Sequence, residues 1–340
     1  VFPEQNAGPQ FEKDAYDMMK QVNDFFVENS HGQLHFMTTV TPLIVMPRPE
    51  AWYKANDTAD ADAVLSDARS AARAAGYDYA SYDLEAVRYS GASGAFSGQA
   101  LVGARGCWLK SSSVGVACHE FGHNLGLWHA NFWNTAGGSI AGSGTNVEYG
   151  NVFDTMGAAS AGNHFFNAGH QNKIGWLPDA NATRVTASGV YRIFQQDQGR
   201  IDPANRYLLA VKKDPQRDYW CEFRQRFSAN RWQMAGVSLL WSPWGDSSSA
   251  GTPYGSNGGG QLLDLGADAL DRARQQPRRI GLRRLPAVEA VAVVPHQRDE
   301  IGLAQRGGAF GHDFLHGVLH FEGKLWRTTQ VTPFVVPSLP

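Results

Sequence analysis

The stretch from Cys118 to Ala130, which reads CHEFGHNLGLWHA, contains three histidines and a glutamate at spacings that suit metal chemistry. His119 and His123 are four residues apart, so a helix would place both imidazoles on one face, with about 6 Å between their Cβ atoms. Glu120 follows the first histidine directly and could contact a water molecule bound to the same ion. The pattern predicts a metal site with a general base beside it.

Gly126 and His129 extend this motif to HExxHxxGxxH. Glycine tolerates the positive φ that ends a helix, so the chain can turn and His129 can offer a third nitrogen. Three protein ligands that leave one position for water are typical of catalytic zinc, whereas structural zinc sites usually have four. We therefore predict that His119, His123 and His129 bind one zinc ion and that Glu120 is the catalytic residue.

A second motif, VEYGNVFDTMG, spans Val147–Gly157 and places Met156 in a glycine-flanked turn 27 residues after His129. Asp154 and Thr155 precede the methionine, and we expect them to hydrogen-bond the backbone of the turn. With these two motifs the chain resembles the metzincin metallopeptidases, whose long zinc motif is followed by a methionine turn beneath the three histidines.

Within the metzincins, the chain resembles the gametolysin (autolysin) family through the runs HNLGLWHA, EYGNVFDTMG and HFFNAGHQNKIGWL, with a likeness over roughly residues 10–264. The algal members have glutamine at the first ligand position, where this chain has His119, which favours an ordinary three-histidine site. The resemblance implies a secreted, extracellular zinc endopeptidase that cuts extended protein or peptide substrates, with wall or matrix proteins as candidate targets. It also leaves open accessory calcium ions and a removed pro-segment.

A glycine-rich segment, Gly91–Gly106, precedes the metal motif. In metzincins the strand before the metal helix is a sheet edge that receives the substrate as an added strand. The resemblance places that rim at Leu101, Val102, Gly103 and Ala104. The glycines alone fit a flexible loop with a short structural strand equally well, and that alternative stays open.

Tyr149 is a candidate oxyanion donor or substrate contact. Some metzincins have a metal-reaching tyrosine two residues after the methionine, but that position is Ala158 here. His164 and His170 could contact the site from a later helix, although core or surface roles are more common for isolated histidines.

The chain has three cysteines, so at least one has no partner within it. Cys107 and Cys118 flank the turn into the metal helix, and a disulfide between them would brace that helix in an oxidising compartment; the sequence leaves the pairing open. A cysteine next to His119 on a helix points about 100° away from it, so Cys118 is not expected to be a fourth ligand. Cys221 lies in a strand-like run and suits a small buried apolar residue.

The elements that must position the site are predicted from apolar periodicity, turn residues and caps. They alternate between helices and strands, which predicts an α/β (α+β) catalytic domain over residues 1–180, with a twisted mixed sheet and an active-site helix. Helices are expected at Phe11–Asn29, at Thr58–Gly76 with Thr58 as N-cap, and at Val114–Leu125 capped by Ser113. Strands are expected at Leu34–Thr38, Leu43–Met46 and Tyr77–Tyr89.

From about residue 181 the pattern becomes β-rich, and residues 181–264 are predicted to form a second, all-β sandwich-like domain. Its expected strands are Val185–Phe194, Arg206–Lys212, Tyr219–Arg224 and Val237–Trp241. Exposed aromatic residues there could bind glycan, although aromatic residues in such strands usually belong to the core.

The tail from residue 265 to 340 is atypical. Between Gly266 and Gly308 every basic side chain is arginine apart from a histidine, and the strand alternation fades. An altered reading frame or a divergent tail would each produce this pattern. If the tail is foreign to the fold, we expect disorder or poor packing after about residue 265.

The composition of the 340-residue chain is that of a globular protein, with 43% hydrophobic residues and a net charge of −2. This balance suggests neither nucleic acid nor an anionic membrane surface as a partner. No apolar run approaches the ~20 residues that span a bilayer. Val1–Gln10 is polar and lacks an initiator methionine, so we expect a fragment or a processed form. Oligomeric state is not indicated.

Two other functions fit parts of the sequence. The chain could be an extracellular binding or adhesion module with a silent metal site, but such a site has no chemical need for Glu120. It could also be a metal-dependent hydrolase of something other than peptides, which would share the ligands and differ in the cleft. The methionine turn favours the peptidase.

Overall fold

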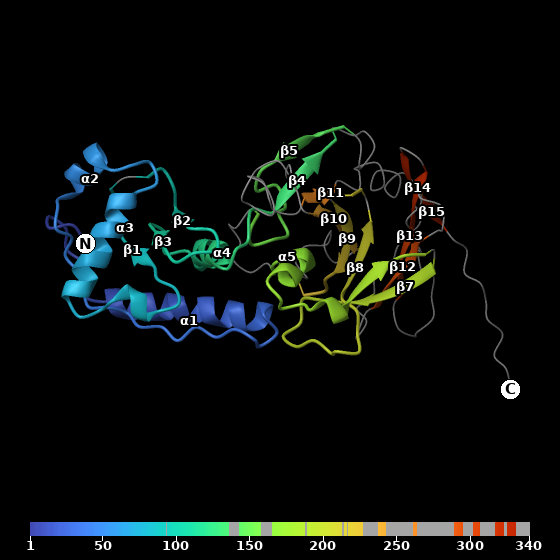
Figure 1. The fold of residues 1–340 in the computed structure, drawn as a ribbon, viewed down its shortest axis with the longest axis horizontal. Helices are drawn as coiled ribbons and strands as arrows, with labels where there is room; N and C mark the ends of the chain where they lie inside the picture. The colour runs from blue at the N-terminus through green and yellow to red at the C-terminus, as the bar shows by residue number, and fades with distance from the viewer. Residues whose placement is uncertain are drawn as a thin grey trace, which may run out of the picture. The chain divides into compact units, whose positions relative to one another are not determined.

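The computed structural model describes residues 1–92, 94–135, 143–157, 165–187, 189–212, 214–215, 217–226 and 237–242, and, as backbone strands, 261–263, 289–294, 302–306, 317–322 and 325–330. The fold is mixed α/β, with several small sheets and few helices (Figure 1). Two compact units divide the chain: unit 1 is Val1–Trp128 with Asp154–Phe166, and unit 2 is His129–Phe153 with Asn167–Pro340. Strands between residues 131 and 147 join the sheet of unit 2, and the domain boundary expected at residue 180 stays a prediction.

Unit 1 combines four α-helices with a three-stranded sheet among the residues described. Its elements are α1 (Phe11–Asn29), α2 (Glu50–Asn56), α3 (Asp62–Ala74), the 3-10 helix η1 (Tyr79–Ser81), β1 (Val87–Arg88), β2 (Gly98–Ala100), β3 (Cys107–Leu109) and α4 (Val114–Asn124). The sheet has the order β1-β3-β2, in which β1 runs parallel and β2 antiparallel to β3.

No helix among the described residues of either unit combines the length and the apolar character that a membrane span requires.

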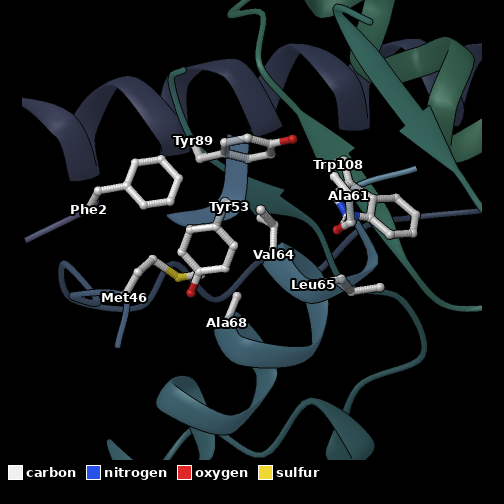
Figure 2. Close-up of a cluster of buried hydrophobic side chains, with 9 residues drawn as sticks. All are labelled: Phe2, Met46, Tyr53, Ala61, Val64, Leu65, Ala68, Tyr89 and Trp108. Atoms are coloured by element: carbon white, nitrogen blue, oxygen red, sulfur yellow. Dashed lines mark hydrogen bonds between the residues drawn. The ribbon is translucent and has the colours of Figure 1, made fainter. Parts of the chain in front are cut away.

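One core of unit 1 forms where α2 and α3 pack on the sheet (Figure 2). Trp108 of β3 is 1% exposed and donates its indole N–H to the carbonyl of Ala61, 2.9 Å away, at the start of α3. Side chains alternate along a strand, so Cys107 and Leu109 point to the opposite face, and α4 contacts β2 and β3. The nine clustered side chains are Phe2, Met46, Tyr53, Ala61, Val64, Leu65, Ala68, Tyr89 and Trp108.

A second, aromatic cluster joins α1 to α4, the helix that bears the metal motif. Phe26 of α1 is fully buried, and its ring centroid lies 6.5 Å from that of Phe121 on α4 and 5.9 Å from that of Phe166. Phe36 bridges the same two helices, at 4.9 Å from Phe26 and 5.3 Å from Phe121. These contacts fix α4 against the longest helix described.

Three of the four α-helices described in unit 1 lie where the sequence predicts them, whereas α2 was not predicted. α1 has the predicted bounds, and α3 ends before Gly76, whose φ is +91°. α3 begins at Asp62 and not just after Thr58, because the Asp57 carboxylate accepts the backbone N–H groups of Ala63 and Val64 at 2.8 and 3.1 Å and fixes the first turn there.

Three predicted strands of unit 1 are absent or shortened. Leu34–Thr38 and Leu43–Met46 form no strand: Phe36 N donates to Asn23 Oδ1 of α1 at 2.7 Å, and Met46 N donates to the carbonyl of Val1 at 2.8 Å. Tyr77–Tyr89 contributes only η1 and the two-residue β1. The alternation was therefore wrong as a sign of strand pairing over residues 34–46.

Unit 2 is built on a seven-stranded sheet of order β5-β4-β11-β10-β9-β8-β6 (Figure 1). β8, β9 and β10 are antiparallel neighbours, whereas β6 runs parallel to β8 and β4 runs parallel to β11. Its elements are β4 (Asn131–Asn134), β5 (Thr145–Val147), α5 (Ala168–Lys173), the 3-10 helix η3 (Asp179–Asn181), β6 (Ala182–Val185), β7 (Gly189–Phe194), β8 (Leu208–Lys212), β9 (Asp218–Phe223), β10 (Val237–Ser242) and β11 (Gln261–Leu263).

The β-rich character predicted from residue 181 is confirmed, and each of the four predicted runs contains a strand. Two strand pairs of this sheet are parallel, whereas the sheets of a sandwich are antiparallel. The structure thus supports a β-rich region, and the sandwich architecture stays a prediction. Within the tail, where disorder or poor packing was expected, the backbone forms four strands, and β12 pairs antiparallel with β7 in a sheet of order β13-β12-β7. These strands are β12 (Glu289–Val294), β13 (Gly302–Arg306), β14 (Gly317–Glu322) and β15 (Leu325–Gln330).

A buried ion pair lies at the end of β9 in the main sheet of unit 2. Glu222 and Arg224 are each 1% exposed, and Glu222 Oε1 lies 2.8 Å from Arg224 Nη2. Glu222 Oε2 accepts the backbone N–H of Ala168, at the start of α5, at 2.6 Å. Arg224 donates to the carbonyl of Phe153, so this pair ties β9 to α5 and to the loop after β5.

Replacement of Arg224 by methionine should therefore lower the free energy of unfolding by about 3–5 kcal/mol, because Glu222 would stay buried without its cation. Urea denaturation measures this loss. Arg184→Met is the matched control: Arg184 pairs with Asp218 at 3.1 Å but is 61% exposed, so it should cost only about 0–1 kcal/mol. Equal losses in the two variants would contradict the assignment.

Candidate metal centre

Helix α4 carries the first two histidines and has well-defined ends. Ser113 Oγ accepts the backbone N–H of Val116 at 3.4 Å, as expected for the predicted N-cap. Gly126 has a φ of +95° and donates to the carbonyl of His123 at 2.8 Å, while the N–H of Leu127 bonds the carbonyl of Gly122 at 3.1 Å. This pair of bonds is a Schellman motif, which reverses the chain just before His129.

The three predicted ligands come together in the structure. His119, His123 and His129 offer nitrogen atoms that all lie within 4.8 Å of one another. The rings of His119 and His123 are nearly perpendicular, with centroids 4.7 Å apart. His119 and His123 are buried, and His129 is half-buried. Among the residues described, this group could hold a metal ion.

Each of the three imidazoles also forms a hydrogen bond through Nδ1, which fixes the orientation of the ring. The acceptors are Thr155 O for His119 at 2.8 Å, Leu127 O for His123 at 2.8 Å and Glu148 Oε1 for His129 at 2.7 Å. Carbonyl and carboxylate oxygens only accept hydrogen bonds, so the proton of each neutral imidazole resides on Nδ1. Nε2 of every ring is then left with a lone pair, which is the form that binds a metal.

The donor set fits a zinc ion. Three neutral imidazole nitrogens are a known ligand set of catalytic zinc, and outer hydrogen bonds of this kind are typical of metal-binding histidines. The same nitrogens would also bind other first-row metals, so the identity of the ion does not follow from the donors.

Glu120 lies on α4 next to the first ligand and is 5% exposed. Burial raises the pKa of its carboxyl to about 8, and the field of a bound cation would draw that pKa down. Its side chain lies against Gly98 of β2: a Cβ at that glycine would be 2.7 Å from Glu120 Oε1. The carboxylate therefore occupies space that β2 leaves open only because residue 98 is glycine.

The turn that contains Met156 has the geometry expected of it. Met156 is fully buried, and its sulfur would lie 2.5 Å from a Cβ at Gly122, on the α4 turn between the first two ligands. Asp154 Oδ1 accepts the N–H of Met156 at 2.7 Å, and Asp154 O accepts the N–H of Gly157 at 2.9 Å. Asp154 thus holds the turn as predicted, and the carbonyl of Thr155 in the same turn contacts His119.

The predicted rim needs correction. The edge strand before α4 is β2, Gly98–Ala100, whereas Leu101, Val102, Gly103 and Ala104 form the turn that follows it. Gly103 and Gly106 have φ of +68° and +130°, and the N–H of Leu101 bonds the carbonyl of Gly106 at 3.0 Å, so the chain bends back into β3. The segment thus contains both of the expected structures: a short strand at Gly98–Ala100 and a turn at residues 101–104.

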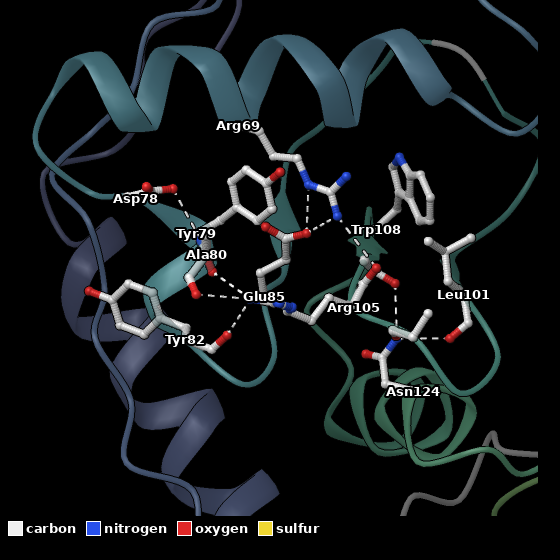
Figure 3. Close-up of polar contacts among 12 residues, drawn as sticks. Arg69, Asp78, Tyr79, Ala80, Tyr82, Glu85, Leu101, Arg105, Trp108 and Asn124 are labelled. Carbon is white, nitrogen blue, oxygen red and sulfur yellow. Dashed lines mark hydrogen bonds and ion pairs between the residues drawn. The ribbon is translucent and has the colours of Figure 1, made fainter.

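The turn after β2 is anchored to α4 by Asn124 (Figure 3). The Asn124 amide donates to the carbonyls of Leu101, Ala104 and Gly106 at 3.0, 2.7 and 3.0 Å. Arg105, in the same turn, donates to the carbonyls of Tyr79, Ala80 and Tyr82 around η1, and its own carbonyl accepts from Arg69 of α3 at 3.4 Å. The turn that follows β2 is thus held by polar contacts with α4, α3 and η1.

The other candidate residues have separate outcomes. Tyr149 lies at the site, with its ring centroid 3.9 Å from that of His129, while its role as an oxyanion donor stays a prediction. His170 is buried in α5, in line with a core role. His164 and Ala158 lie outside the described residues.

All three cysteines are free and buried, so the disulfide left open between Cys107 and Cys118 is not formed. Both side chains are completely shielded from solvent, and burial raises the pKa of each thiol well above its usual range. Burial also raises the pKa of Cys221, to about 12, as suits the small apolar residue expected there.

Three residues with clear roles in this centre were not predicted. Glu148 and Asn124 act through hydrogen bonds whose partners are distant in sequence, and neither belongs to a local pattern that would indicate this. Gly98 did carry a signal, because a glycine inside a strand often marks the close approach of another group.

A scan against protein-family models finds no match for this chain, and searches of curated proteins and of solved structures find none either.

Met156→Ala should lower the free energy of unfolding by about 2–5 kcal/mol, since the deleted side chain leaves a cavity beneath α4. Met156→Leu, which nearly conserves volume, should cost less than about 1.5 kcal/mol. The matched control is Met37→Ala, because Met37 is 96% exposed and should change stability by less than about 0.5 kcal/mol. Thermal or urea unfolding compares the three; a loss at residue 37 equal to that at residue 156 would contradict the packing described.

Proposed function

We propose that this protein is a zinc-dependent endopeptidase that hydrolyses peptide bonds of extended protein substrates. The observation that carries the proposal is that all three histidines are held through Nδ1, which leaves three Nε2 atoms for one ion, with the buried carboxylate of Glu120 on the same helix. A purely structural site would have no use for that carboxylate and would usually have a fourth protein ligand.

The chemistry divides between the ion and Glu120. When bound, zinc supplies Lewis acidity that polarises a peptide carbonyl and makes water acidic enough to act as a nucleophile near neutral pH. Glu120 accepts the proton of the attacking water and then delivers it to the leaving amine, so that one carboxyl serves as general base and general acid in turn. Its low exposure keeps competing water away from that proton.

The substrate is proposed to bind along β2. This strand is at the edge of its sheet, and its residues are half-buried, so its outer backbone groups suit the addition of an extended peptide strand. β2 is also the strand that contacts Glu120 through Gly98, which would bring an added peptide next to the base. This mode favours unfolded or repetitive proteins over compact ones.

The family assignment is part of the same proposal. The HExxHxxGxxH motif and the Met156 turn support membership of the metzincins, and the longer runs support the gametolysin family. An extracellular location and wall or matrix proteins as substrates follow from that assignment alone.

Glu120→Gln should reduce cleavage of a denatured protein substrate by about 10²–10⁴-fold while the variant still binds one zinc ion, because the amide cannot accept the proton. Cleavage and metal content are measured in the same samples. Glu12→Gln is the control, since it removes an equal charge from the exposed first turn of α1. A zinc-loaded wild type that cuts no protein would overturn the proposal and favour the binding-module alternative.

Gly98→Ala should leave zinc binding intact but reduce turnover on the order of 10²-fold, because the new Cβ would displace the carboxylate of Glu120. The control is Gly8→Ala, where nothing lies within 4 Å of an added Cβ. Steady-state cleavage rates with metal content measure the difference. Full activity in the Gly98 variant would show that the base does not depend on this contact.

A further inference from the structure

The third ligand, His129, is held differently from the other two. His119 and His123 are fixed by α4 and bonded to backbone carbonyls, whereas His129 follows the helix and is bonded to a side chain, Glu148 Oε1, at 2.7 Å. The His129 ring lies outside the helix, where the Tyr149 ring contacts it with centroids 3.9 Å apart and the Glu148 carboxylate accepts from its Nδ1. The carboxylate is therefore the hydrogen-bond partner that selects which ring nitrogen faces the ion.

Glu148 is itself placed by a tight turn after β5. The N–H of Gly150 bonds the carbonyl of Val147 at 3.0 Å, and Tyr149 has a φ of +59°, which non-glycine residues rarely adopt. A Cβ at Gly150 would lie 2.5 Å from Phe132 Cβ, so the turn is packed directly on β4.

Two hydrogen bonds join this turn to the residues just after His129. The N–H of Tyr149 donates to Asn131 Oδ1 at 3.0 Å, and the N–H of Asn151 donates to the carbonyl of Ala130 at 3.1 Å. Asn131 and Asn151 are both buried, which protects these bonds from water. The backbone that follows Glu148 is therefore fixed to Ala130 and Asn131, the two residues that follow the third ligand.

We propose that Glu148 is a positioning residue of the metal centre: its carboxylate accepts the Nδ1–H of His129 and thereby holds Nε2 of that ring toward the ion. The inference rests on the metal site of the proposed function, but not on peptidase activity. Glu148 is about half exposed and does not contact the reacting groups, so it acts only through His129.

The partial exposure of Glu148 lets a role in metal binding be distinguished from a role in folding. A hydrogen bond to a carboxylate that is 51% exposed contributes little to folding, so removal of the carboxylate should leave the unfolding midpoint of the metal-free protein nearly unchanged. Removal of the partner of a metal-binding histidine typically weakens metal binding by 10–100-fold, since the ring loses both its orientation and part of its basicity.

The experiment measures zinc affinity by competition with a chromophoric chelator in the wild type, Glu148→Gln, Glu148→Ala and the charge-matched control Glu12→Gln. We expect Glu148→Ala to bind zinc about 10–100-fold more weakly. Glu148→Gln should be intermediate, since its amide oxygen still accepts a hydrogen bond, and Glu12→Gln should equal the wild type. The visible spectrum of the cobalt-loaded proteins gives a second readout, which should shift in the Glu148 variants alone.

Zinc affinity of Glu148→Ala within twofold of the wild type would overturn the inference, as would a loss of affinity accompanied by an equal loss of stability in the metal-free form. Neither result would affect the proposed peptidase. Conversely, a wild type that binds zinc but cuts no protein would overturn the proposed function and leave the role of Glu148 measurable. A wild type that binds no zinc would overturn both.

Discussion

The metal centre depends on the hydrogen bonds at Nδ1 of its three histidines. A helix can place two imidazoles on one face, but it does not decide which nitrogen carries the proton or how each ring is turned. Here acceptors from three different segments make that choice: the turn after α4, the Met156 turn and the turn after β5. The local structure of these turns positions the acceptors. It includes the positive φ of Gly126 and the Asp154 hydrogen bonds.

Close packing around α4 supports the same arrangement. Because residues 98 and 122 are glycines, β2 can approach the Glu120 carboxylate and Met156 can approach α4 between the first two ligands. Phe121 fixes the helix to α1 through the aromatic cluster. Protein interiors are packed densely enough that such contacts restrict a helix in both translation and rotation.

The sequence predicted well the features that arise from local patterns. Periodicity, caps or motif spacing predict the bounds of α1, the start of α4 with its Ser113 cap, the Gly126 turn, the metal group and four strand-containing runs of unit 2. It failed where the outcome depends on distant partners. Residues 34–46 were expected to contain strands, yet the N–H groups of Phe36 and Val40 bond Asn23 and Tyr16 of α1, and that of Met46 bonds the carbonyl of Val1. The Glu148 contact joins residues 19 apart through a turn whose geometry no short motif encodes.

The state of the cysteines has a consequence for how this fold is held together. All three thiols of the chain are buried and held in the protonated form, and no covalent cross-link joins any of them. Neither reductants nor mild oxidants reach a cysteine sulfur in the folded chain, because thiol chemistry requires an exposed thiolate. The packing around the three cysteines therefore does not depend on a disulfide bond.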